Sequence, residues 1–179
     1  MYRIAINGFG RIGRNIVRAL YERPELREQI QIVAINDLGS LEISAHLLQF
    51  DTVHGRFNQQ VEVTDNAIII NGDVINWSSE RNPTDLPWAD LNVDLVCECT
   101  GVFTSREKAA MHLEAGAKKV IISAPGANAD ATIVFGVNDH VLDGSKEIIS
   151  NASCTTNCLA PMVQPLQESI GILSGYMTT

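Results

Sequence analysis

The sequence predicts an α/β fold with a doubly wound, mostly parallel sheet, followed by the start of a second domain. Three observations support this fold class. A glycine-rich turn follows the first apolar strand, β-rich runs alternate with helical patterns over the first 150 residues, and the pattern changes from residue 151. Alternation of this kind is typical of parallel strands joined by crossover helices.

The first half of the chain contains two strand and helix pairs and then a group of short strands. The expected strands and helices are RIAIN (3–7), RIGRNIVRALYE (11–22), IQIVAIN (30–36) and SLEISAHLLQF (40–50). After the loop DTVHGRF (51–57), the runs QVEVT, AIIING and DVINW between residues 60 and 77 predict a small antiparallel meander. The segment 81–92 has two prolines and is expected to form a loop.

The α/β rhythm then resumes and ends in a different pattern. The expected elements are VDLVCECT (93–100), SREKAAMHLEAG (105–116), KKVIISAP (118–125), ATIVFGV (131–137) and KEIIS (146–150). Residues 154–171 indicate a helix bent by two prolines, and residues 172–179 indicate a strand. Because that strand has no partner after it, we expect these residues to begin a second domain whose remainder lies outside this chain.

Composition excludes several classes of function. The 179 residues are 45% hydrophobic and carry a formal net charge of -8, which disfavours binding to a nucleic-acid backbone. No run approaches the roughly 20 apolar residues of a membrane span, and the amino terminus lacks a secretory apolar core. We therefore expect a cytoplasmic protein with no nucleic-acid or membrane partner.

The amino-terminal loop predicts a dinucleotide site. Gly8, Gly10 and Gly13 have G-x-G-x-x-G spacing between a strand and a helix, directly after Asn7, and all four residues are expected to contact the dinucleotide. This arrangement lets a pyrophosphate approach the backbone at a helix N-terminus. Asp37 follows the second strand and is expected to accept hydrogen bonds from both ribose hydroxyls, which favours NAD over NADP. The alternative is a glycine turn with a solvated aspartate.

The four cysteines divide into two pairs with different expected roles. Cys97 and Cys99 share one face of a strand, without the spacing of common zinc modules, so we expect two packed side chains and no metal. Cys154 opens a helix after a strand, where free N–H groups favour a thiolate nucleophile. Cys158, one helical turn later, is expected to be a packed small residue.

The motifs also resemble a known family. INGFGRIGRN, VAIND, FDTVHGRF, CECTGVFTSRE, AGAKKVIISAP and SNASCTTNCLAP are similar, in this order, to segments of the glyceraldehyde-3-phosphate dehydrogenases. The resemblance implies a Rossmann domain for NAD over residues 1–150, an α+β catalytic domain that starts with residues 151–179, and a homotetramer. It also implies that a Cys154 thioester carries glyceraldehyde 3-phosphate to an acyl phosphate, with inorganic phosphate as co-substrate.

The resemblance implies roles for further residues. Arg11 and Ile12 would line the dinucleotide site, and Asp37 would hold the adenosine ribose. Further cofactor contacts would come from Arg81, Thr100, Gly101, Phe103 and Ser123. Ser153 and Thr155 would hold the attacking phosphate.

One departure from the family pattern affects catalysis. The general-base histidine of the family would follow residue 179, and none of the four histidines matches it. His54 is expected to make structural hydrogen bonds in its loop. We therefore expect these 179 residues alone to be nearly inactive, and the intact protein to be an enzyme.

Three other functions fit parts of the sequence. Erythrose-4-phosphate dehydrogenase has the same loop and cysteine motif, and the ratio of kcat/KM for the two aldehydes would separate them. A non-catalytic NAD-binding module would form no thioester on Cys154. A cysteine hydrolase would leave the glycine loop and Asp37 without a use.

Overall fold

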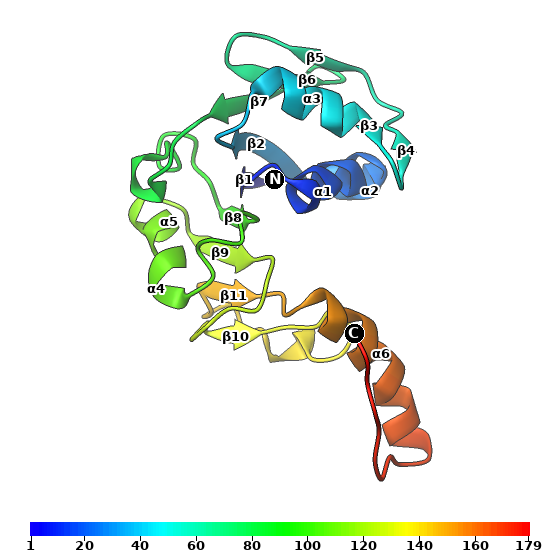
Figure 1. Ribbon diagram of the computed structural model, residues 1–179. Coiled ribbons are helices and arrows are strands. Elements are labelled where there is room, and N and C mark those ends of the chain that lie inside the picture. The colour runs from blue at the N-terminus through cyan, green and yellow to red at the C-terminus, as the bar shows by residue number, and fades with distance from the viewer.

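The computed structural model describes residues 1–179 and contains one nine-stranded sheet (Figure 1). Its strand order is β10-β11-β9-β8-β1-β2-β7-β6-β5. The strands are β1 (Tyr2–Asn7), β2 (Ile30–Asn36), β5 (Val61–Val63), β6 (Ala67–Ile70), β7 (Asp73–Ser78), β8 (Leu95–Glu98), β9 (Lys119–Ile122), β10 (Ala131–Thr132) and β11 (Ile148–Ser150). All pairs from β7 to β10 are parallel, which confirms the doubly wound Rossmann-type sheet.

Helices cover both faces of the sheet. Figure 1 shows α1 (Arg11–Tyr21), α2 (Pro24–Arg27) and α3 (Leu41–Gln49) on one side. On the other side lie α4 (Arg106–Ala109) and α5 (Met111–Glu114). Two 3-10 turns, η1 (Pro83–Asp85) and η2 (Asp139–Val141), lie in loops. The crossovers change side between β2 and β8, so β1 lies at the reversal point of the sheet.

The central strands are apolar on both faces because both faces are covered. Ile6 and Ile35 pack with the α1 and α3 side chains in one core cluster. Ala5 and Ala34, which point the other way, pack with Trp88 in a second cluster. Such strands show a continuous apolar run rather than an alternation.

The meander is confirmed, and it joins the main sheet. Strands β5, β6 and β7 pair antiparallel, while β7 also pairs parallel with β2. The loop at 51–57 contains a short hairpin of β3 (Phe50–Asp51) and β4 (Gly55–Arg56). The strand expected at 131–137 is reduced to β10, and a turn follows it.

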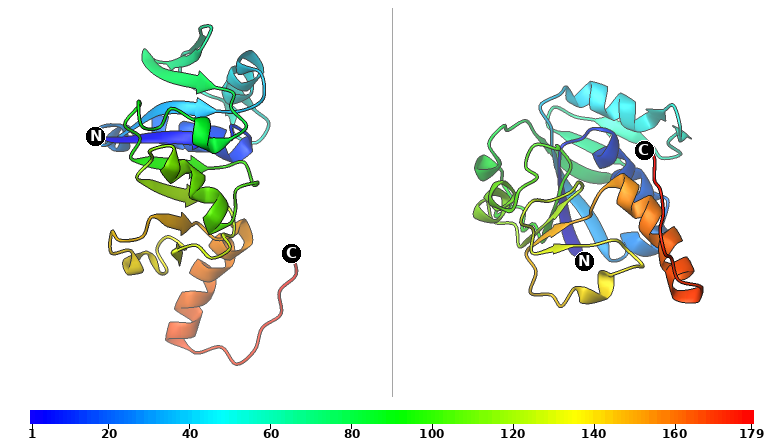
Figure 2. Two further views of the ribbon diagram at one scale, coloured as in Figure 1. Left: turned by 90° about the vertical axis from the view of Figure 1, so that its left-hand side faces the viewer. Right: turned by 60° about the horizontal axis from the view of Figure 1, so that its bottom comes forward.

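The end of the chain differs from the expectation. The helix α6 (Cys154–Ser169) contains Pro161 and Pro165, and no residue of it is buried. Figure 2 shows α6 extending away from the sheet. The strand expected at 172–179 was wrong, because no neighbouring strand supplies the hydrogen bonds that strand backbone requires. None of the helices combines the length and apolar character needed to cross a membrane.

The Asp130 carboxylate connects helix α4 to the start of strand β11. Asp130 accepts hydrogen bonds from the N–H groups of Glu147 and Ile148, both at 3.0 Å, and from Arg106 Nε at 2.8 Å. The Ile148 N–H and the Arg106 guanidinium lower the pKa of Asp130 to about 2. This carboxylate therefore holds the β10–β11 edge in place in its ionised form.

We expect Asp130→Ala to lower the free energy of unfolding by about 1–2 kcal/mol at pH 7, because two N–H groups lose their acceptor. The lowered pKa means that the contribution is present above about pH 4 and is lost as pH falls towards 2. Urea unfolding of both proteins at pH 7 and at low pH measures the difference. Asp65→Ala, at an exposed site, is the control. A difference independent of pH would contradict this account.

Candidate functional site

The carboxyl ends of three parallel strands meet beside a cleft of about 320 Å³. Asn7, Asn36 and Glu98 are the last residues of β1, β2 and β8. In open α/β sheets, ligands bind at the reversal point, outside the carboxyl ends of the strands. The cleft therefore occupies the position that the fold favours for a nucleotide.

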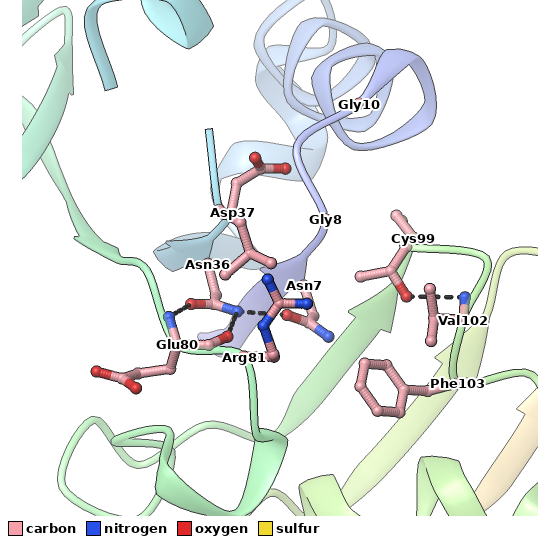
Figure 3. Close-up of a pocket in the computed structure, with 12 residues that line it drawn as sticks. Asn7, Gly8, Gly10, Asn36, Asp37, Glu80, Arg81, Cys99, Val102 and Phe103 are labelled. Carbon is pink, nitrogen blue, oxygen red and sulfur yellow. Dashed lines mark hydrogen bonds between the residues drawn. The ribbon is translucent and has the colours of Figure 1, made fainter. Parts of the chain in front are cut away.

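Figure 3 shows the cleft and the residues that line it. Seven were expected from the sequence: Asn7, Gly8, Gly10, Asp37, Arg81, Thr100 and Phe103. Five were not: Asn36, Leu38, Glu80, Cys99 and Val102. The fold thus gathers one set of side chains from the first strand, the second strand and two later loops.

The glycine loop is closely packed against its surroundings except at one position. A Cβ on Gly8, whose φ is +92°, would lie 2.7 Å from the Thr100 nitrogen, and a Cβ on Gly13 would lie 2.3 Å from the Gly8 oxygen. A Cβ on Gly10 would meet nothing within 4 Å. Gly10 lines the cleft, so the open space beside it fits the pyrophosphate of a dinucleotide.

The first turn of α1 faces this space with uncapped N–H groups. Gly10 is the N-cap residue and offers no side-chain hydrogen bond. A helix N-terminus of this kind attracts anions. Arg11 was expected at the same site, but it does not line the cleft and instead pairs with Asp51, with 2.9 Å between Nη1 and Oδ2. The pKa of Asp51 is lowered to about 2, and the hydrogen bond from the His54 N–H makes the largest contribution.

Asp37 is held at the end of β2 by two backbone groups. Its Oδ2 accepts from the Phe9 N–H at 2.6 Å, and its Oδ1 accepts from the Gly39 N–H at 2.7 Å. Each carboxylate oxygen retains lone-pair capacity for a further donor. The carboxylate is thus fixed beside the glycine loop, where it can accept from ribose hydroxyls.

A second cleft of about 380 Å³ adjoins Cys154. It is lined by Ile12, Ile16, Cys97, Ile121, Ser123, Asn151, Ala152, Ser153, Cys154 and Asn157. Cys154 is exposed and is the first residue of α6, and Ser153 caps that helix by accepting the Thr156 N–H at 3.0 Å. Gly13, Gly101 and Thr155, which were expected at the site, line neither of these two clefts.

Burial distinguishes the four free cysteines. It raises the pKa of Cys97 to about 12 and that of Cys99 to about 11, and both pack against the core as expected. Cys158 is exposed, which corrects the expectation of a packed residue, because no residue of α6 is buried. His54 lines neither cleft, and its backbone N–H donates a hydrogen bond to Asp51 Oδ1.

A buried polar cluster beneath the first cleft was missed by sequence reasoning. Glu98 and His112 are 1% and 0% exposed, with 2.8 Å between Oε2 and Nε2. Trp88 Nε1 donates to His112 Nδ1 at 3.0 Å. The sequence did contain one signal, which is Glu98 inside the mostly apolar run 93–100. A carboxylate buried in a strand requires hydrogen-bond donors around it, so donors such as His112 had to be present in the fold.

Comparisons with known proteins agree with this geometry. Residues 2–106 match the family model for the glyceraldehyde 3-phosphate dehydrogenase NAD binding domain, and residues 153–179 match the model for the C-terminal domain of the same enzyme. The first match covers the glycine loop, Asp37 and all other lining residues of the first cleft.

Several relatives are similar over nearly the whole chain. The chromosomal glyceraldehyde-3-phosphate dehydrogenase of Cupriavidus necator is 60% identical over 99% of this chain and 53% of its own length. The Pseudomonas aeruginosa enzyme is 59% identical over the same shares, and the Clostridium acetobutylicum enzyme is 52% identical over 100% of this chain and 52% of its own. The chain spans about half the length of these relatives. It belongs to the glyceraldehyde-3-phosphate dehydrogenase family.

Proposed function

We propose that the protein oxidises glyceraldehyde 3-phosphate with NAD and inorganic phosphate to 1,3-bisphosphoglycerate. The observation that carries this proposal is the position of α1 between the two clefts. Gly10, its N-cap residue, lines the first cleft, and Ile12, in its first turn, lines the second. A dinucleotide with its adenosine beside Asp37 and its pyrophosphate at Gly10 would extend towards Cys154.

The cofactor roles follow from the chemistry of each lining residue. The Asp37 carboxylate binds the ribose hydroxyls and disfavours a 2'-phosphate. Arg81 and Phe103 offer a planar guanidinium and an aromatic ring, which suit the faces of adenine. Thr100 lines the first cleft and Ser123 the second, so both would border the cofactor, with Gly101 next to Thr100 in the chain.

Cys154 acts as the nucleophile. Its thiolate adds to the aldehyde carbon, and the new C–S bond is retained when that carbon loses a hydride to give a thioester. NAD held by the residues of the first cleft would supply the hydride acceptor for this step. A phosphate oxygen then attacks the resulting thioester carbonyl, and the thiolate leaves. The N–H groups at the start of α6 can stabilise negative charge at each stage, with Ser153 and Thr155 beside the phosphate.

The remaining parts of the proposal rest on the family. The names of the relatives favour the three-carbon substrate over erythrose 4-phosphate. We assign residues 1–150 to the NAD-binding domain and residues 151–179 to the catalytic domain. A cytoplasmic homotetramer is the assembly that the family resemblance implies.

NAD binding can be tested at Gly10. We expect Gly10→Val to weaken NAD binding at least about tenfold, because the new side chain would occupy the space of the pyrophosphate. Tm should change by no more than about 4 °C, since nothing lies within 4 Å of the added Cβ. Calorimetric titration with NAD measures this, and Gly175→Val, at another open position, is the control. Unchanged affinity would place the cofactor elsewhere.

The thioester can be tested by comparing two exposed cysteines of one helix. In the full-length protein, Cys154→Ser should lower kcat at least about 1000-fold, because the nucleophile is lost. Cys158→Ser should retain a rate close to wild type. Mass spectrometry after mixing with glyceraldehyde 3-phosphate and NAD, without phosphate, should find the acyl group on Cys154. An adduct on Cys158, or none, would count against this mechanism and favour a binding module.

A further inference from the structure

We propose that Glu98, His112 and Trp88 form a buried positioning network that holds the adenosine half of the first cleft in its binding shape. None of the three lines the cleft. The inference rests on the proposed NAD binding and assigns a role to residues outside the expected site.

Glu98 is the centre of the network. Its Oε1 accepts from the Thr100 N–H at 2.8 Å and from the Thr100 hydroxyl, and its Oε2 accepts from Asn7 Nδ2 at 2.6 Å and His112 Nε2 at 2.8 Å. Glu98 forms no ion pair with lysine or arginine. Four donors therefore satisfy a buried carboxylate, and two of the donor residues, Asn7 and Thr100, line the cleft.

Trp88 fixes the tautomer of His112. An indole N–H can only donate, and it points at His112 Nδ1, 3.0 Å away, so this nitrogen must be the acceptor. The imidazole proton then lies on Nε2 and is donated to Glu98. His112 thus serves the carboxylate as a neutral donor whose orientation is set from the far side by Trp88.

The network continues from Glu98 to the second strand. Asn7 Oδ1 accepts from Asn36 Nδ2 at 2.7 Å, and the same Nδ2 donates to the Glu80 carbonyl at 2.9 Å. The Glu80 N–H returns a hydrogen bond to Asn36 Oδ1 at 2.8 Å. Figure 3 shows these bonds from Asn7 through Asn36 to Glu80, next to Arg81. One connected set of bonds therefore fixes the ends of β1, β2 and β8 and the loop after β7.

His112 also contacts an aromatic wall of the cleft. The His112 and Phe103 rings have centroids 6.3 Å apart and meet edge to face, at 75°. A change in the orientation of His112 would move the ring that Phe103 packs against. The adenosine half of the cleft is thus supported at Asn7, Thr100 and Phe103 by groups that do not touch the ligand.

Desolvation argues for a role in positioning. An apolar cluster of similar volume would fill this part of the core without burying a carboxylate, and such replacements are often neutral or stabilising. The buried carboxylate instead fixes the directions of four hydrogen bonds. Its contribution should therefore appear in nucleotide affinity beyond any effect on stability.

The first test is Glu98→Gln. The amide keeps the shape of the carboxylate but replaces one acceptor oxygen with an NH2 group. This NH2 group must face the Thr100 donors or the donors of Asn7 and His112, which then lose their acceptor. We expect the Kd values for NAD and AMP to rise by the same factor, about tenfold, while binding of nicotinamide mononucleotide is unchanged. The control is Val120→Ala, in a separate core cluster formed with Ala109, Ile122 and Ile148; it should lower the Tm of the protein without changing AMP binding.

The second test is Trp88→Phe, which removes the N–H group and retains an aromatic ring. Nitrogen-15 NMR of the wild-type chain without nucleotide should find His112 protonated at Nε2 only. In the variant, the preference for this tautomer should weaken, and AMP binding should weaken with it.

Some outcomes would overturn the positioning role alone, and one outcome would also overturn the proposed function. The inference fails alone if wild-type protein binds NAD normally and Glu98→Gln does not weaken AMP binding, or if Val120→Ala weakens it equally at the same loss of Tm. It also fails if wild-type His112 carries its proton on Nδ1. A wild-type protein that binds neither NAD nor AMP overturns the proposed function as well.

Discussion

The close approach of α1 to the ends of β1 and β8 is the constraint on which the rest of the structure depends. It is possible only because two positions lack a side chain: a Cβ on Gly13 would overlap the Gly8 oxygen, and one on Gly8 would overlap the Thr100 backbone. This contact places the uncapped N-terminus of α1 between the two clefts. The nucleotide cleft, the position of Ile12 and the access to Cys154 all follow from it.

The same region contains a buried carboxylate, Glu98, whose desolvation is unfavourable. A carboxylate at the end of a central strand loses its water on folding, and Glu98 recovers hydrogen bonds only because β1, the loop after β8 and α5 bring donors to it. Its donors include Asn7 and Thr100, which border the cleft. The hydrogen bonds that stabilise the buried Glu98 carboxylate therefore also fix two residues that line the first cleft.

Much of this organisation could be predicted from the sequence, and the exceptions have physical causes. Alternating segments and the glycine spacing depend on near neighbours in the chain, so the sheet was predicted correctly, and Asp37 lines the first cleft. His112 meets Glu98 and Trp88 only after folding, across 14 and 24 residues of sequence, so no local sequence pattern predicts these two contacts. The strand expected at 172–179 was wrong for a related reason, since an apolar pattern does not supply a pairing partner.

The four cysteines have identical side chains but differ in burial and position. Cys97 and Cys99 each line a cleft, but burial raises the pKa of both, which keeps them as thiols near neutral pH. Cys158 is exposed but lies a turn inside α6, away from the free N–H groups and outside the second cleft. Cys154 alone combines exposure, a place in the second cleft and the first position of a helix, so its position rather than its residue type distinguishes it for the proposed role of nucleophile.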